Sequence, residues 1–216
     1  MTAVTALRLL VWIAVMVWCG AGGALAGGWP RAKGELFVAA AHYANPGGGY
    51  SGVYLDYGVT ARLGLGVDWG RSVTGKEKAV MFLRWPLRQG KMAAGLQLGA
   101  GIIDHRQVLR PGLSLGRSVT VQGRSGWIAS DVLAEIGRDG AMDLKADITL
   151  GVTLSPRVIA MVQVQAGQPR HDPRFLRLVP SVLWRLKGGT QLEFGLTQDL
   201  MRGGTSGVKL GLWRTF

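Results

Sequence analysis

The sequence predicts an all-β fold class, a closed antiparallel up-and-down transmembrane β-barrel of about 12 strands. Apolar residues occupy every second position in short runs that continue to the last residue, as in 92–102 and 142–154. This period gives each strand one apolar and one polar face. The polar face is rich in Gly and charge, and the apolar face has the length of a tilted bilayer crossing, about 9–11 residues. A soluble barrel is the alternative, but it would hide its apolar face inside.

The first 26 residues have the organisation of a cleaved signal peptide, so residues 27–216 form a single barrel domain. Arg8 precedes an apolar run at 9–18, and Ala24-Leu25-Ala26 matches a small-x-small cleavage site. An uncleaved membrane helix is the other interpretation, although the run is short for a crossing of about 20 residues. Cys19 is the only cysteine and would leave with the signal, which excludes disulfides and thiolate chemistry.

The strands in the first half of the barrel are separated by strong turn signals. Asn45-Pro46-Gly47-Gly48-Gly49 joins the first two strands, and tight turns follow at 59–61 and 88–90. Each strand between these turns shows alternation, with Gly or a charged residue opposite each apolar residue. The expected strands are 34–44, 50–57, 62–70, 78–87, 91–103 and 112–121.

The second half continues the same pattern. Turns are expected at 123–126, 137–140, 155–157 and 188–189, which are rich in Gly, Pro and Ser. Pro180 interrupts one run, because proline removes a ladder hydrogen bond and belongs at a bulge or an edge. An even number of strands lets both chain ends lie on the periplasmic side. The expected strands are 127–136, 142–154, 158–166, 175–187, 191–198 and 207–216.

The charge balance is strongly basic, with 25 Lys and Arg against 13 Asp and Glu and a formal net charge of +12. The basic residues are dispersed, with no basic block and no nucleic-acid motif, which argues against nucleic acid as a partner. In an exported chain, anionic lipid headgroups, surface polysaccharide or small anionic solutes are better partners.

Alternation directs one set of charged residues toward the barrel lumen. With Asp56, Lys78, Asp131 and Glu135 included, this set has seven acidic and eight basic members. Such nearly balanced charges can form salt bridges that fill the interior or can border a narrow water path. The candidate lumen-lining residues are Arg62, Asp68, Arg84, Lys91, Asp143, Lys145, Asp147, Arg177, Arg185, Glu193 and Lys209.

The excess positive charge falls in the expected outer loops, 104–110 and 167–174 among them. Guanidinium groups bind phosphate with two hydrogen bonds, and the outer leaflet of such a membrane carries phosphorylated lipopolysaccharide. The candidate lipopolysaccharide contacts are Arg106, Arg110, Arg170 and Arg174. Solvated loop charge is the simpler alternative for these four residues.

The chain ends with Val208, Leu210, Leu212 and Phe216, an alternating apolar series that closes on an aromatic residue, although Arg214 departs from it. This ending resembles the C-terminal pattern of bacterial outer-membrane β-barrel proteins. That resemblance implies recognition of the last strand by the barrel-assembly machinery and localisation to the outer membrane of a Gram-negative envelope. The segment 28–34 and the hairpin Tyr54 to Gly66 resemble small proteobacterial barrels assigned to transport.

Two functions are therefore expected: a small porin-like channel for small solutes, or a non-conducting structural barrel that binds lipid or envelope partners. Enzymatic activity is not expected. His42-Tyr43-Ala44-Asn45 resembles the His-x-Ser-Asn segment of outer-membrane lipid A deacylases, but Ala44 replaces the nucleophilic serine. Two His-Asp pairs fall in the expected loops, but they lack the defined spacing of metal ligands. No metal site is therefore expected, and no catalytic or cofactor-binding site is expected either.

Overall fold

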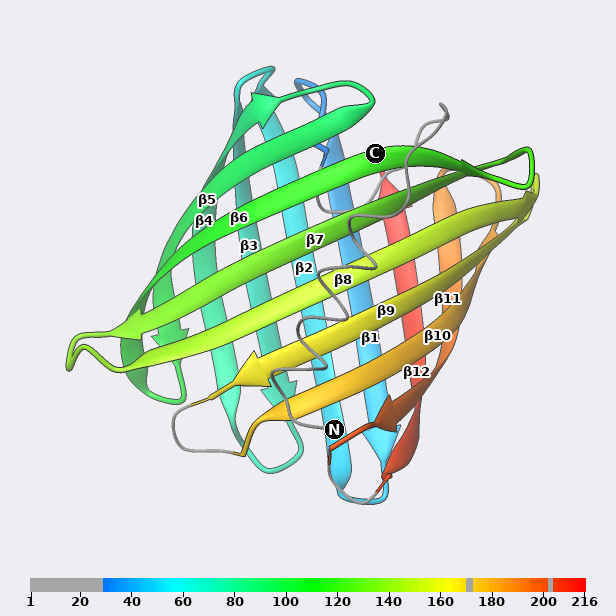
Figure 1. The fold of residues 1–216 in the computed structure, drawn as a ribbon. Coiled ribbons are helices and arrows are strands. Elements are labelled where there is room, and N and C mark those ends of the chain that lie inside the picture. The colour runs from blue at the N-terminus through cyan, green and yellow to red at the C-terminus, as the bar shows by residue number, and fades with distance from the viewer. Residues whose placement is uncertain (1–28, 170–172, 202–203) are drawn as a thin grey trace.

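Twelve strands form one closed antiparallel barrel in the computed structural model, which describes residues 29–169, 173–201 and 204–216 (Figure 1). Each strand pairs with the next in sequence, and β12 pairs with β1 to close the barrel. This arrangement confirms the predicted fold class and strand number. The strands are β1 (Leu36–Asn45), β2 (Gly48–Thr60), β3 (Leu63–Ser72), β4 (Glu77–Arg88), β5 (Met92–Ile103), β6 (Arg106–Val121), β7 (Arg124–Gly137), β8 (Met142–Ser155), β9 (Val158–Gln168), β10 (Phe175–Arg185), β11 (Thr190–Asp199) and β12 (Ser206–Thr215).

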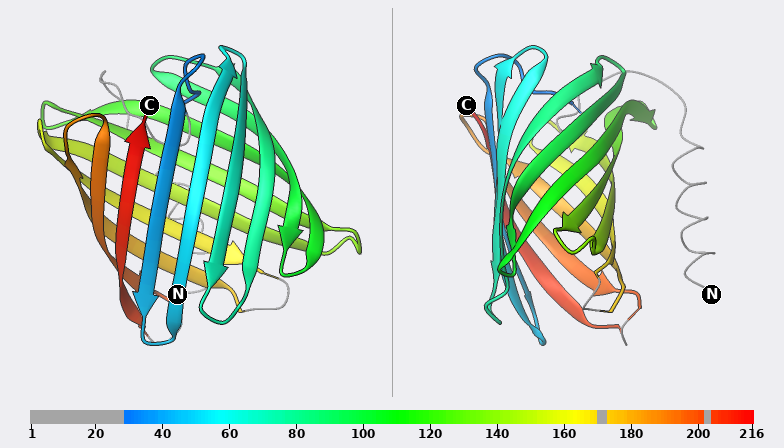
Figure 2. Two further views of the ribbon diagram at one scale, coloured as in Figure 1. Left: turned by 180° about the vertical axis from the view of Figure 1, so that it is seen from behind. Right: turned by 90° about the vertical axis from the view of Figure 1, so that its left-hand side faces the viewer.

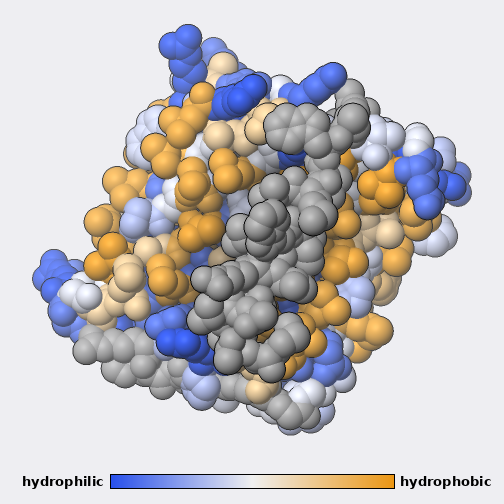
Figure 3. Space-filling view, viewed as in Figure 1, coloured by the Kyte–Doolittle hydropathy of each residue, from blue (hydrophilic) through white to orange (hydrophobic). Residues whose placement is uncertain are grey.

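The outer surface of the barrel is apolar between two polar ends. Large apolar side chains at alternate positions, such as Leu96, Leu98 and Leu150, are exposed on this surface. The visible face in Figure 3 carries hydrophobic residues over the strands and hydrophilic residues mainly toward the ends. The apolar outer band is suited to contact with lipid chains. The closed barrel also pairs every strand edge, which the hydrocarbon layer requires because it offers no hydrogen-bond partners. Among the described residues, no helix is long and apolar enough to cross a membrane.

Both ends of the described chain lie at the same end of the barrel, which we call the terminal end (Figure 2). Leu36 begins β1 beside Phe216, and the two residues exchange backbone hydrogen bonds of 3.3 and 2.9 Å. We call the opposite end, which holds the β1–β2 and β5–β6 turns, the far end. Each interior position can therefore be placed by its distance along a strand from one of these ends.

The sixth strand begins at Arg106, six residues earlier than the sequence predicted. Asp104 and His105 both adopt a positive φ, 47° and 64°, so these two residues suffice to turn β5 into β6. Asp and His enter this conformation more readily than most residues other than Gly. The expected loop at 104–110 is therefore wrong, since most of it is strand, and Arg110 points into the barrel.

Pro180 lies within β10 without shifting the register of the strand. It pairs with Val162 of β9, and the pairing with β11 resumes in the same register at Ser181. Its side chain is on the exposed outer face. The proline thus removes one hydrogen-bond donor from the ladder without forming the bulge that the sequence left open.

Candidate functional site

The interior contains a cavity of about 420 Å³ that is bordered mainly by polar and charged side chains. Strand alternation builds this lining, because residues directly opposite in neighbouring strands share a face. Thus Asp147 of β8 lies between Asp131 of β7 and Gln165 of β9, and Gln165 lies next to Arg177 of β10. The cavity reaches from the level of Arg31 near the terminal end toward the far end.

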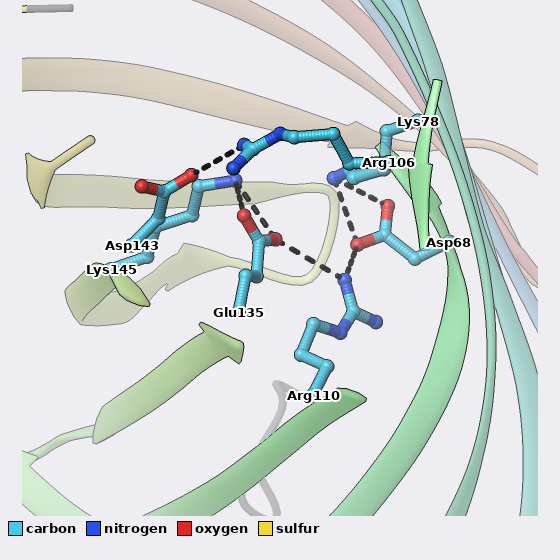
Figure 4. A network of polar contacts seen from close by, with 7 residues as sticks. All are labelled: Asp68, Lys78, Arg106, Arg110, Glu135, Asp143 and Lys145. Carbon is cyan, nitrogen blue, oxygen red and sulfur yellow. Dashed lines mark hydrogen bonds and ion pairs between the residues drawn. The ribbon is translucent and has the colours of Figure 1, made fainter. Parts of the chain in front are cut away.

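A chain of ion pairs crosses the far half of the interior (Figure 4). Asp68 binds Lys78 at 2.8 Å and also Arg110, which lies 3.9 Å from Glu135. Glu135 in turn binds Lys145 at 2.7 Å. These residues come from β3, β4, β6, β7 and β8, so the network joins five strands across the interior.

A separate pair extends this region toward the far rim. Arg106 at the start of β6 lies 3.2 Å from Asp143 near the start of β8. The Arg106 side chain is about one third exposed, while Asp143 is mostly buried. Charged groups with satisfied partners of this kind fix the shape of the polar interior rather than repel one another.

Two arginines share one carboxylate in the terminal half. Asp56 Oδ2 lies 3.1 Å from Arg84 and 3.4 Å from Arg31, and all three side chains are almost fully buried. Arg84 also donates a hydrogen bond of 2.8 Å to the Tyr54 hydroxyl. Buried charges require such partners, because desolvation costs several kcal/mol per ion, on the order of the attraction itself.

Glu193 anchors the remaining side of the terminal half. It binds Lys209 at 2.7 Å and accepts a hydrogen bond of 3.0 Å from the Trp213 indole nitrogen. The Lys209 ammonium also lies 5.3 Å from the centre of the Tyr43 ring. These contacts connect β11, β12 and β1 across the seam that closes the barrel.

Two carboxylates in the middle of the cavity are not neutralised by a described ion pair. Asp131 accepts a hydrogen bond from Ser114, and Asp147 lies directly opposite it in the register. Next to them, Gln163 donates to Thr149 at 3.3 Å, and Gln165 donates to Gln163 at 3.1 Å. The central wall on β7–β9 therefore offers acidic and amide groups to a solute.

Apolar side chains fill part of the terminal half. Trp127, Ala129, Ile159, Met161 and Leu183 form one buried cluster, which we call the terminal cluster, and Trp29 and Trp213 pack against it. The terminal cluster comes from β7, β9 and β10 and faces the Asp56–Arg84 pair across the interior. The interior is thus polar toward the far end and more tightly packed toward the terminal end.

The structure brings seven of the eleven predicted lumen residues to the cavity. Asp143 lies beyond it at the far rim, bound to Arg106. The seven residues that border the cavity are Asp68, Arg84, Lys145, Asp147, Arg177, Glu193 and Lys209.

The other three predicted lumen residues, Arg62, Lys91 and Arg185, lie at the terminal end. Arg62 and Lys91 are exposed in turns, one residue before β3 and β5 begin. Arg185 ends β10 and donates to the Pro156 carbonyl oxygen at 3.5 Å. The expected strands began one residue too early at Arg62 and Lys91, and alternation has no meaning within a turn. Arg185 is still a strand residue, but it lies at the strand end, outside the cavity lining.

Sequence reasoning missed Arg31 and Arg110 as interior residues. Arg31 precedes the first strand, where no periodic signal could place it. Arg110 follows the alternation of Val108, Gly112 and Ser114 in β6, but Pro111 interrupts that pattern. Extension of the polar period backward through the proline would have found Arg110.

The four arginines expected to contact lipopolysaccharide occupy different environments. Arg110 is only 1% exposed inside the barrel, so the expectation for this residue is wrong. Arg106 is partly exposed at the far end, and Arg174 is exposed just before β10. Arg170 lies outside the described residues.

His42 lies near the far end of β1, on the outer face. Its Nδ1 is 2.9 Å from the Ser51 hydroxyl of β2, its register partner. A histidine that activates a serine is itself oriented by a further group. No described hydrogen bond joins His42 to a carboxylate, and the described residues contain no cluster of three or more His, Cys, Asp or Glu that could hold a metal ion.

Comparison with known proteins relates the fold to bacterial porins. No protein-family description and no curated protein matches the chain. The KdgM porin is 7% identical and superposes with a TM-score of 0.65 over 83% of this chain and 99% of that one. The NanC porin is 7% identical with a TM-score of 0.58, covering 83% and 98% of the two chains. An outer-membrane channel from Pseudomonas putida F1 is 11% identical, with a TM-score of 0.57 over 90% of this chain and 100% of the other.

Proposed function

We propose that the protein is an outer-membrane channel for small hydrophilic solutes. The observation that carries this proposal is the charged cavity inside a barrel whose outer surface is apolar. A barrel that served only as a membrane anchor could fill its interior with apolar side chains. Here the strands instead hold charged and polar side chains around open space, which supports a path for water and solutes.

Small solutes with a modest preference for anions fit the lining. Seven basic side chains and five acidic ones border the cavity. One neighbour in fold, the KdgM porin, is described in complex with oligogalacturonate, which is an anionic sugar chain. The balance of charge in this protein favours weak rather than strict selectivity, because most basic groups here are bound to carboxylates.

A non-conducting barrel is the second candidate function, and the terminal cluster favours it. Leu183 and Met161 are buried in a packed interior at that end. If this packing never opens, the cavity would be a blind pocket that faces the outside of the cell. Envelope binding through the far end would then be the role of the protein.

The two chain ends suggest how the barrel would reach the outer membrane and how it would be oriented there. Residues 1–26 would direct export, and the exposed Phe216 beside β12 would present the barrel to the assembly machinery. The terminal end would then face the periplasm and the far end the outer leaflet. Of the four arginines expected to contact lipopolysaccharide, Arg106 and Arg174 lie at this end and would contact its phosphates.

Planar lipid bilayers provide the test of the channel proposal. We expect the purified, folded protein to produce discrete current steps under an applied voltage. Under a salt gradient, the reversal potential should show a modest anion preference. Folded protein that inserts without any current above the bare bilayer would favour the non-conducting barrel.

The central carboxylates should limit anion preference. Neutralising both with Asp131→Asn and Asp147→Asn leaves seven basic and three acidic groups around the cavity. We therefore expect the reversal potential to move further toward that of a pure anion channel, since fixed charge in a low-dielectric passage selects against ions of its own sign. The matched control is Asp104→Asn in the β5–β6 turn at the far end, outside the cavity lining. An equal shift in the control would contradict a central role for Asp131 and Asp147.

A further inference from the structure

The segment 29–35, which precedes β1, lies at the terminal end and reaches across the interior. At one side, Gly34 donates a backbone hydrogen bond of 2.8 Å to Gly58 of β2, and Gly58 donates one of 2.9 Å back to Glu35. At the other side, the Trp29 indole donates to the Gly90 carbonyl in the β4–β5 turn at 3.1 Å. Trp29 also packs on the terminal cluster of β7, β9 and β10. The segment therefore connects opposite parts of the barrel wall.

The wall contains recesses that match the segment. A Cβ atom at Gly58 would collide with the carbonyl oxygen of Ala32. A Cβ atom at Gly116 of β6 would lie 2.7 Å from the Trp29 ring. Neither glycine adopts a positive φ, so backbone conformation does not demand glycine at these two positions. The absent side chains make room for residues 29–35 instead.

A buried charge fastens the middle of the segment. Arg31 is 5% exposed, lies 3.4 Å from Asp56 and stacks 4.1 Å from the centre of the Phe37 ring. Asp56 is shared with Arg84, so displacement of Arg31 leaves that carboxylate paired. Because the cost of desolvation offsets much of the attraction in such a pair, the contact can exchange between a bound and a released form.

We propose that residues 29–35 are a gate that closes the terminal end of the channel. With the segment seated, Arg31 and Trp29 occupy the space between the Asp56–Arg84 pair and the terminal cluster. Release of the segment would connect the cavity with the terminal end. The wild-type protein then populates a predominant closed state and a minor open state, whose ratio is set by the contacts of the segment.

The gate rests on the proposed channel function, and the wall glycines test it without altering the segment. Gly58→Val should expel the segment by collision with Ala32, and we expect the open probability in planar bilayers to rise on the order of tenfold. Gly116→Val should do the same by displacing Trp29 on the other side. Gly64→Ala is the matched control, because a Cβ atom there meets its nearest neighbour, Asp56, at an ordinary 3.4 Å.

Trypsin supplies a readout that does not depend on conduction. Arg31 is buried while the segment is seated, whereas Lys33 is exposed. Every protein in this assay therefore carries Lys33→Gln, which removes the exposed tryptic site within the segment. Cleavage after Arg31 should then be slow with no further change and in Gly64→Ala, and fast in the two valine variants. Mass spectrometry of the intact chain measures this cleavage.

Fast cleavage together with increased current supports the gate. Fast cleavage with unchanged, measurable current in both valine variants overturns the gate but leaves the channel. Absence of current in every protein, with fast cleavage in the variants, overturns the channel itself. Cleavage and current that equal those of the wild type in both folded valine variants also overturn the gate.

Discussion

Replacing Arg84 by Glu is expected to lower the free energy of unfolding by about 3–5 kcal/mol. The substitution removes the cation that lies 3.1 Å from the buried Asp56 and places a second carboxylate beside it. It also removes the hydrogen bond to the Tyr54 hydroxyl. Denaturant unfolding of the barrel in lipid vesicles measures the change.

Arg185→Glu is the control for this charge reversal. Arg185 ends β10 and has no described ion pair, and its hydrogen bond to the Pro156 carbonyl is long, at 3.5 Å. Arg185 is partly exposed, so we expect a loss below about 1 kcal/mol, as for charged groups that water can reach. A loss at Arg84 as small as that at Arg185 would contradict the assignment of a buried ion cluster.

Arginine in place of Ile148 is expected to destabilise the barrel by about 2–4 kcal/mol, because it would place a charge in the hydrocarbon layer. Ile148 lies in the middle of β8 on the outer face. Thr149, the next residue, faces the cavity beside Gln163. Arginine at Thr149 can approach Asp147 and Asp131, so we expect a smaller loss there. The same unfolding measurement compares the two variants, and equal losses would show that the two faces of β8 are assigned incorrectly.

Alternation predicted most of the fold because the physical constraint acts on every residue of every strand. A lipid-facing side chain must be apolar, and its neighbours face the polar interior, so the period is visible in the sequence over all twelve strands. The prediction was wrong at the strand ends and turns, where residues no longer alternate between lipid and the interior. Lys91 and Arg62 were assigned to strands although they lie in turns, and a two-residue turn at Asp104 and His105 was taken for a long loop.

The interior could be predicted only in part. Alternation identified Asp68, Lys145 and Glu193 as inward residues, but it could not show which charges pair. Pairing depends on register between strands, and register is set by turns and bulges that one sequence leaves open. Arg31 has no periodic context at all, so the contacts of the segment 29–35 became visible only when the strands around it were placed.

Uptake of a small neutral sugar by proteoliposomes tests most directly whether solutes cross through this interior. Liposomes that contain the folded wild-type protein should swell in an isotonic pentose solution faster than protein-free liposomes, and those that contain Gly58→Val should swell faster still. A large oligosaccharide should produce no swelling with either protein, because the passage is narrow. Swelling rates equal to those of protein-free liposomes for both folded proteins would contradict a solute passage and leave the filled, non-conducting barrel.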